Sequence, residues 1–188
     1  MTDTIRDVVE ISKELFDKGL VTGKAGNISI RYDKDAIAIT PTLKSLGDLK
    51  EEDIVIVKYN GEILTKGKPS SEVGMHLEIY KNREDVNAIV HTHSPYATGF
   101  AFSDKKIKRL EGFGKINKEY LEELEYKKPG SVDLALGAAT ALGEDDVLIL
   151  KNHGVIAVSF DLKEASELAG FVEETSKTQF ISHVLNSI

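Results

Sequence analysis

The chain has 188 residues, and its 24 Lys and Arg residues against 31 Asp and Glu residues give a formal net charge of −7. It contains no cysteine, which excludes disulfides, thiolate metal sites, iron–sulfur clusters and cysteine nucleophiles. The acidic balance argues against a general binder of nucleic-acid backbones, and no apolar run approaches the roughly 18 residues of a membrane-spanning helix. Because the N-terminal segment also lacks the apolar core of a signal peptide, we expect a cytoplasmic protein with no membrane or nucleic-acid partner.

Hydrophobic periodicity, capping residues and turn signals predict helices and strands along the whole chain. Helices are expected over residues 5–16, 72–82, 132–142 and 162–185, and strands over residues 27–32, 36–40, 53–58, 62–64, 86–93, 147–150 and 155–159. The polar stretch 103–128 is interpreted as a loop with a short helix. Regular βαβ alternation and a Gly-x-Gly-x-x-Gly motif are missing from the sequence. The order of elements therefore favours a single α/β domain over residues 1–188, with three layers and a central, mostly antiparallel mixed β-sheet flanked by helices.

The tripeptide His91-Thr92-His93 lies on a predicted strand. Residues two apart on a strand face the same side, so the two imidazoles can converge on one point. Two histidines joined by a third ligand from elsewhere make the open zinc site that catalysis needs. An ordinary buried strand with two hydrogen-bonded histidines would give the same tripeptide.

His153 is the candidate third ligand, in a turn between two apolar strands. A side chain in such a turn can reach a site from a rigid base, and imidazole is the natural zinc ligand where thiolate is missing. The plainer interpretation is a turn histidine whose neighbour Gly154 supplies a positive φ. Of the remaining histidines, His76 is interpreted as a supporting or structural residue and His183 as incidental.

Glu72 stands at a predicted helix start, directly after Ser70 and Ser71. A carboxylate there is the residue expected to cap the helix. Beside a metal ion, the same carboxylate can serve as a fourth ligand or as a general base. His76 lies four residues further on, on the same face of the helix.

Three turns are candidates for binding an anion. Asn27 ends a Gly-containing turn before a strand, Thr42 lies in a turn after one, and Ser70 and Ser71 offer hydroxyls beside the free N–H groups of a helix start. Each is ordinary turn chemistry by itself. Together they could surround a phosphate, although their spacing does not show that they meet.

Five segments resemble the class II aldolase/adducin family, in family order and with family-like spacing. They are Ala25-Gly26-Asn27-Ile28-Ser29, Ile39-Thr40-Pro41-Thr42, Lys68-Pro69-Ser70-Ser71-Glu72, Ala88-Ile89-Val90-His91-Thr92-His93-Ser94 and Leu150-Lys151-Asn152-His153-Gly154. The similarity runs from about residue 8 to residue 180. It implies the class II aldolase-like fold and a homotetramer with active sites between subunits.

The resemblance also implies the site and its chemistry. One zinc ion per subunit would be held by His91, His93 and His153, with Glu72 as the catalytic acid and base that also contacts the metal. The substrate phosphate would be bound by Asn27, Thr42, Leu43, Ser70 and Ser71. The implied reaction is the reversible cleavage of a short ketose 1-phosphate, such as L-fuculose 1-phosphate, to dihydroxyacetone phosphate and an aldehyde such as lactaldehyde.

Other functions occur on the same scaffold. The alternatives are a pentulose-phosphate 4-epimerase, a phosphosugar dehydratase or decarboxylase, and a non-catalytic adducin-like assembly module. Epimerases of the family tend to carry Asp at the position of Glu72, and adducin-like modules lack the metal histidines. Both features favour the aldolase.

Two positions qualify the resemblance. Leu43 follows Thr42 where the family usually has Gly, so we expect its side chain to crowd the phosphate or to change the backbone conformation of that loop. Tyr126 is the positional candidate for a tyrosine that a neighbouring subunit contributes to the aldehyde half of the site. The alternative interpretation of Tyr126 is an interface residue.

Overall fold

The computed structural model describes residues 2–109 and 118–188, which form one seven-stranded β-sheet with the strand order β3-β2-β1-β4-β7-β6-β5. The strands are β1 (Asn27–Arg31), β2 (Ala36–Ile39), β3 (Val55–Lys58), β4 (Ala88–Thr92), β5 (Glu122–Leu124), β6 (Val147–Leu150) and β7 (Gly154–Ser159). Every neighbouring pair is antiparallel except β5 and β6, which run parallel. The expected mixed, mostly antiparallel sheet is confirmed.

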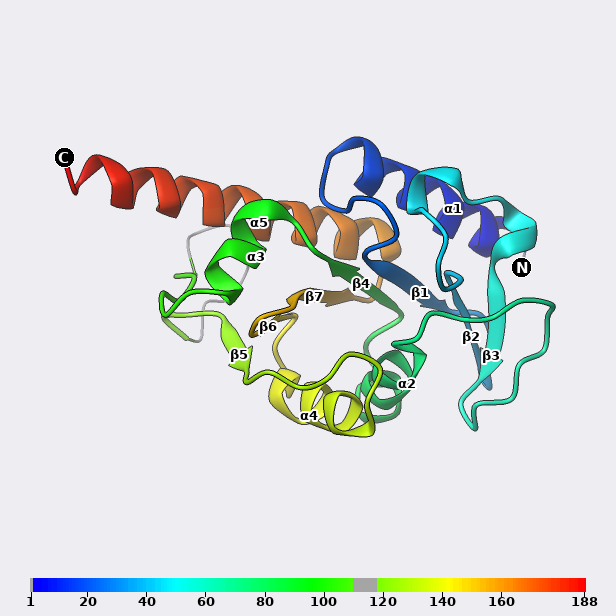
Figure 1. Ribbon diagram of the computed structural model, residues 1–188. Coiled ribbons are helices and arrows are strands. Elements are labelled where there is room, and N and C mark those ends of the chain that lie inside the picture. The colour runs from blue at the N-terminus through cyan, green and yellow to red at the C-terminus, as the bar shows by residue number, and fades with distance from the viewer. Residues whose placement is uncertain (1, 110–117) are drawn as a thin grey trace.

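Helices cover both faces of this sheet (Figure 1). They are α1 (Thr2–Asp17), α2 (Val73–Asn82), α3 (Pro95–Ala101), α4 (Val132–Leu142) and α5 (Leu162–Leu185), with short 3-10 turns at Leu46–Asp48 and Glu51–Asp53. Helices α2 and α4 pack on one face, and α1, α3 and α5 pack on the other, which gives the predicted three layers. Among the described helices, none combines the length and the apolar character needed to cross a membrane.

Alternation along the strands assigns side chains to the two faces. On β2, Ile37 and Ile39 pack towards α2 and α4, whereas Ala36 and Ala38 pack towards α1. A strand that is covered on both faces is apolar at every position, which explains the sequence of β2. The same alternation directs the side chains of Asn27, Ser29 and His91 towards α2, because their strand neighbours belong to the opposite core.

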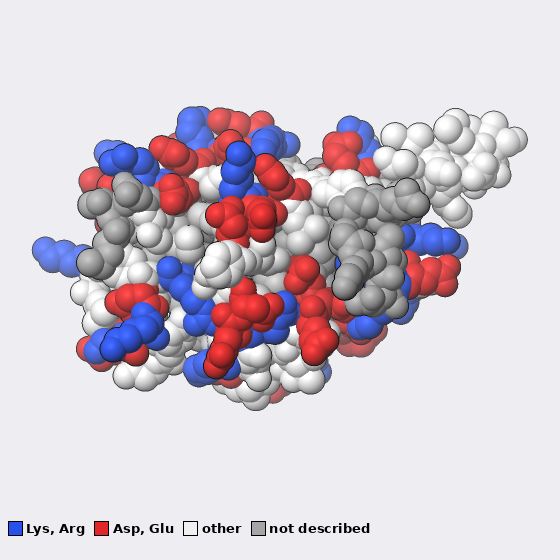
Figure 2. All heavy atoms as spheres, turned by 180° about the vertical axis from the view of Figure 1, so that it is seen from behind, with Lys and Arg blue, Asp and Glu red and all other residues white. Residues whose placement is uncertain are grey.

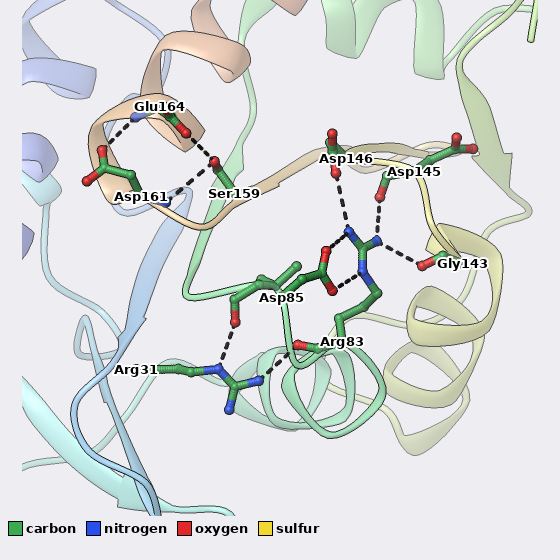
Figure 3. A network of polar contacts seen from close by, with 10 residues as sticks. Arg31, Arg83, Asp85, Gly143, Asp145, Asp146, Ser159, Asp161 and Glu164 are labelled. Carbon is green, nitrogen blue, oxygen red and sulfur yellow. Dashed lines mark hydrogen bonds and ion pairs between the residues drawn. The ribbon is translucent and has the colours of Figure 1, made fainter. Parts of the chain in front are cut away.

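Two arginines anchor the C-terminal end of α2 (Figure 3). Arg31 donates to the carbonyl oxygens of Tyr80, Arg83 and Val86. Arg83 pairs with the Asp85 carboxylate and also donates to the carbonyl oxygens that follow α4, at Gly143 and Asp145. These contacts join α2 both to β1 and to the residues that follow α4, and they hold the helix in one orientation over the sheet.

Three details differ from the sequence expectation. No helix was expected directly after the predicted strand 86–93, but Pro95 is the first residue of α3, a position where its missing N–H costs nothing. The predicted strand 62–64 is reduced to a single bridge between Val57 and Ile63. In the described parts of 103–128, a strand, β5, stands in place of the expected short helix, and residues 110–117 lie outside the described residues.

The surface carries both signs of charge. On the face seen in Figure 2, acidic and basic side chains are interspersed among the described residues, in agreement with the modest net charge of −7. The last turns of α5 extend away from the body and carry no charged side chains (Figures 1 and 2). The large apolar side chains exposed there are Phe180, Ile181, Val184, Leu185 and Ile188.

Candidate active site

His91, His93 and His153 lie together at one end of the sheet. β4 ends one residue after His91, and β7 begins one residue after His153. The antiparallel pairing of β4 with β7 therefore brings the β6–β7 turn beside the end of β4. One ligand atom from each of the three rings lies within 4.8 Å of the others, so the fold brings together the histidines that the sequence pattern singled out.

Gly154 permits this close packing. A Cβ atom added there would overlap the carbonyl oxygen of Thr92 and would lie 3.0 Å from Cδ2 of His93 and 3.2 Å from Cε1 of His91. The expectation that Gly154 supplies a positive φ is wrong, because the left-handed residue of the turn is Asn152, with a φ of 56°. The glycine is required by the approach of β4 and the imidazole rings rather than by the turn.

Hydrogen bonding orients the rings. Nδ1–H of His91 donates to the carbonyl oxygen of Val155 at 2.9 Å, which directs Nε2 into the cluster. There it lies 2.9 Å from Nε2 of His93. Two imidazole nitrogens this close repel one another unless a proton or a cation lies between them.

Glu72 completes the cluster. Its Oε2 lies 3.2 Å from Nε2 of His91, and its Oε1 lies 3.4 Å from Nε2 of His153. Although Glu72 immediately precedes α2, its side chain accepts no hydrogen bond from the helix end, and the hydroxyl of Ser70 accepts one from the Glu72 N–H instead. Interpreting Glu72 as a helix cap is therefore wrong, because the buried carboxylate turns towards the histidines.

The electrostatics of the cluster favour the metal-binding protonation states of Glu72, His93 and His153, whereas they favour the protonated ring of His91 while no cation is bound. Burial, followed by the charge of His91, lowers the pKa of His93 to about 3 and that of His153 to about 4. Burial opposes ionisation of Glu72, but the nearby imidazoles of His91 and His153 together with a hydrogen bond from Asn27 bring its pKa below the ordinary value. For His91, burial favours the neutral ring, and the Glu72 carboxylate reverses this and raises the pKa. An ionised carboxylate beside neutral imidazoles is the state that coordinates a divalent ion.

The residues present fit a divalent metal ion. Three imidazoles and one carboxylate, without any thiolate, form the donor set of open catalytic zinc sites. Two polar atoms of the cluster are buried without a hydrogen-bond partner among the described residues, namely Oε1 of Glu72 and Nδ1 of His153. An unpaired carboxylate oxygen that faces the imidazoles is available to a cation or to a substrate proton.

Behind Glu72 lies a chain of buried polar side chains. Nδ2 of Asn27 donates to Oε2 of Glu72 at 3.0 Å, and Oδ1 of Asn27 lies 2.5 Å from Nε2 of His76. Nδ1 of His76 lies 2.6 Å from the hydroxyl of Ser29, which lies 2.9 Å from the hydroxyl of Tyr80. Sequence reasoning assigned His76 a supporting place but missed Ser29 and Tyr80. The signal was present in the spacing, because Glu72, His76 and Tyr80 recur every four residues on one helix face.

The candidate phosphate residues lie on two adjacent segments. Thr42 N–H donates to the carbonyl oxygen of Lys68, and Ser70 N–H donates to that of Thr40, so residues 40–43 run beside residues 68–71. Thr42, Ser70 and Ser71 are thereby placed next to the start of α2, and Asn27 reaches the same place through Glu72.

Leu43 adopts the left-handed conformation, with a φ of 62°, and its side chain is 73% exposed. The backbone at Leu43 thus has a conformation that glycine favours and a branched residue adopts at a cost of about 1–2 kcal/mol. The side chain points into solvent at the edge of the loop.

No polar contact joins Tyr126 to this cluster among the described residues. Tyr126 is 53% exposed in the segment between β5 and α4. The following segment does approach the site, because a Cβ atom on Gly130 would lie 2.9 Å from the carbonyl oxygen of Ser71.

The sheet, the helical layers and the cluster at the strand ends define an α/β protein with a metal-binding type of site. A profile of the family described as Class II Aldolase and Adducin N-terminal domain matches residues 6–180. The chain belongs to this family.

Two relatives and one solved structure illustrate the similarity. The chain is 43% identical over 173 residues to the L-fuculose phosphate aldolase of Methanococcus maripaludis strain C7, a match that covers 92% of this chain and 94% of that protein. It is 31% identical to the 3-oxo-tetronate 4-phosphate decarboxylase of Haemophilus influenzae, over 96% of this chain and 89% of that protein. The solved structure of an L-fuculose 1-phosphate aldolase superposes with a TM-score of 0.91 at 30% identity, covering 98% of this chain and 88% of that chain.

Proposed function

We propose that the protein is a zinc-dependent class II aldolase that reversibly cleaves a short ketose 1-phosphate to dihydroxyacetone phosphate and an aldehyde. L-Fuculose 1-phosphate, which yields lactaldehyde, is the first substrate to consider, because relatives across nearly the full length carry that activity in their names. The observation that carries the proposal is the contact of the buried Glu72 carboxylate with His91 and His153.

We assign the zinc ion to His91, His93 and His153, with one ion per subunit and Glu72 within reach of it. When bound, the metal supplies Lewis-acid polarisation of the substrate carbonyl and hydroxyl oxygens. This electrostatic contribution is the alternative to a Schiff-base lysine for stabilising negative charge during aldol cleavage.

Glu72 moves the proton. In the cleavage direction, the C4 hydroxyl gives its proton to the ionised Glu72 carboxylate and becomes the aldehyde, while the bond between C3 and C4 of the ketose breaks and its electron pair stays on C3. Glu72 donates a proton to C3 to give dihydroxyacetone phosphate, and in the synthetic direction it removes that proton again. Oε1 of Glu72 supports this role, because it lies near His153 without accepting a hydrogen bond, whereas Oε2 is engaged by Asn27.

The phosphate site in this proposal consists of Asn27, Thr42, Leu43, Ser70 and Ser71. Support comes from the adjacency of residues 40–43 and 68–71 at the start of α2, because the N-terminus of a helix favours an anion. Leu43 would contribute through its backbone N–H, since its side chain is exposed.

We further propose a homotetramer in which Tyr126 serves the aldehyde half of a neighbouring subunit's site. The exposure of Tyr126 supports this assignment. The exposed apolar side chains at the end of α5 also support it, since exposed apolar patches are typical of interfaces. Light scattering on the purified protein tests it. A tetrameric mass is expected, and a monomer would contradict the intersubunit role of Tyr126.

The function is tested with L-fuculose 1-phosphate and ribulose 1-phosphate, with and without a chelator, by measuring the release of dihydroxyacetone phosphate. Triose release that stops on chelation and returns with zinc is expected. A new ketose without triose would identify an epimerase instead. Release of carbon dioxide from 3-oxo-tetronate 4-phosphate, without aldol cleavage, would favour the activity named for the Haemophilus relative.

A further inference from the structure

In the series of buried hydrogen bonds behind Glu72, the chemistry of each group determines which partner donates and which accepts. An ionised carboxylate only accepts hydrogen bonds, so Asn27 must present its NH2 group to Oε2 of Glu72, at 3.0 Å. The carboxamide oxygen of Asn27 then faces Nε2 of His76, at 2.5 Å, and can only accept. His76 is therefore the tautomer with its proton on Nε2, and its Nδ1 accepts from the hydroxyl of Ser29 at 2.6 Å.

The series of hydrogen bonds continues from Ser29 to Tyr80, which is its last member. Since Ser29 uses its proton towards His76, the hydroxyl of Tyr80 donates to Ser29 at 2.9 Å, the shorter of its two contacts, and the carbonyl oxygen of Asn87 lies further away at 3.3 Å. His76 and Ser29 are fully buried, and Asn27 and Tyr80 are nearly so. In so dry an environment, water cannot replace a wrongly directed hydrogen bond.

We propose that His76 is a positioning residue for Glu72, acting through Asn27. Its Nε2–H holds the Asn27 carboxamide in the one orientation that donates to Oε2 of Glu72, which leaves Oε1 free to exchange a proton with substrate. The catalytic part of this proposal rests on the proposed aldolase function, whereas the orientation rests only on the contacts of the protein itself.

The opposite orientation of Asn27 is disfavoured twice. A flipped carboxamide would place its oxygen against the Glu72 carboxylate and its NH2 group against the N–H of His76. Each mismatch leaves two buried polar groups that repel one another and that water does not reach, so each disfavours the flipped orientation. Without a donor at the position of Nε2 of His76, only one of the two penalties remains, so the carboxamide and the carboxylate lose part of their orientation.

The first test measures the tautomer directly, in the chelator-treated protein and without any activity. The protein is labelled with 15N in its histidines, and the ring nitrogens of His76 are assigned by comparison with His76→Gln. A protonated Nε2 and an unprotonated Nδ1 at neutral pH are expected. A proton on Nδ1 would overturn the proposal.

The second test compares two amides of related shape. The NH2 group of His76→Gln coincides with Nε2 of the histidine and can still donate to Asn27, whereas His76→Asn reaches only the position of Nδ1. With similar zinc content and similar unfolding midpoints, we expect His76→Asn to lose about 10- to 100-fold in kcat with little change in KM, and His76→Gln to retain most of kcat. Equal kcat values in the two folded variants would overturn the positioning role.

The two tests separate the proposals. A wild-type protein that releases no triose would overturn the aldolase function, and the tautomer would still decide the orientation of Asn27. A wild-type protein that is active but carries the wrong His76 tautomer would overturn the positioning role and leave the aldolase function intact.

Discussion

Asn27 and His91 are register partners on the antiparallel strands β1 and β4. Both side chains project towards α2, and both meet the same carboxylate oxygen, Oε2 of Glu72, at 3.0 Å and 3.2 Å. One backbone pairing therefore sets the distance between the amide donor and the imidazole. Glu72 is held against the sheet from two sides, and its position depends on the register of the two strands.

The metal assignment predicts a clear difference between histidines. His93→Ala removes one of the three converging rings, so the affinity of the protein for zinc should fall by more than about 100-fold. Replacing a residue that only hydrogen-bonds to a metal ligand typically lowers the affinity by about 10- to 100-fold. Equilibrium dialysis with zinc measures this. His183→Ala, at an exposed position on α5, is the control and should bind zinc like the wild type. Wild-type affinity in His93→Ala would contradict the assignment.

The proton-transfer assignment predicts that Glu72→Gln keeps zinc and loses turnover. The amide is the same size as the carboxylate but does not accept a proton, so kcat should fall by about 10²- to 10⁴-fold. The release of dihydroxyacetone phosphate and the zinc content are measured on the same sample. Glu78→Gln, on the same helix and paired with Lys81, is the matched control and should remain active. Full activity in Glu72→Gln would return Glu72 to a structural role.

The close approach at Gly154 predicts a steric effect on the site. Gly154→Ala places a methyl group against the carbonyl oxygen of Thr92 and against two of the histidine rings, so the free energy of unfolding should fall by about 1–3 kcal/mol and zinc binding should weaken. Urea unfolding and dialysis measure the two effects. Gly99→Ala is the control, because a Cβ atom there meets nothing within 4 Å and alanine favours a helix. A Gly154→Ala protein as stable as the wild type would contradict the packing.

The buried ring of His76 predicts a pH dependence of stability in the chelator-treated protein. Burial, helped by the charge of His91, lowers the pKa of His76 to about 3. In the unfolded chain the pKa is about 6.5, so the unfolded state takes up this proton first as the pH falls. The contribution of His76 to the free energy of unfolding is complete above about pH 6.5 and is lost as the pH falls towards the folded pKa.

In His76→Gln, the slope of the free energy of unfolding against pH should therefore be smaller by about 1 kcal/mol per pH unit near pH 5.5. Urea titrations at several pH values measure the slope. Tyr80→Phe removes a neighbouring hydroxyl and leaves the ring in place, so its slope should match the wild type. Equal slopes in wild type and His76→Gln would show that the folded ring takes up its proton as readily as the unfolded chain does.

Most elements of the fold follow from local patterns. The expected helices over 132–142 and 162–185 coincide with α4 and α5. In each, the capping residue, Ser131 or Asp161, and the apolar periodicity indicate the same helix start. α3 was missed because proline can either end a strand or begin a helix, and only the surroundings decide. β5 was missed because its Glu-Glu-Leu sequence has little strand character and is held by pairing with β6 at the sheet edge.

Part of the candidate site could also be predicted from local sequence patterns. The spacing of His91 and His93 on a strand showed that two rings share a side, but the third ring and Glu72 meet them only through the tertiary fold. The role of Gly154 was mistaken because a close approach of another strand leaves no mark on local sequence. The hydrogen bonds of Ser29 and Tyr80 likewise depend on how α2 lies over β1, and this is set by contacts between distant segments, from Arg31 to the carbonyl oxygen of Arg83 and from Arg83 to that of Gly143.

The ring of His91 and the carbonyl group of Val155 that orients it are 64 positions apart in the chain. Segments so distant come together late, because the entropy of closing a long loop is spent before their contacts form. The first turn of α2 and strand β1 must also be in place before the polar groups converge. Uptake of a divalent ion during refolding would therefore report completion of the central strands, and its rate should follow the slowest step of sheet assembly rather than the formation of any single helix.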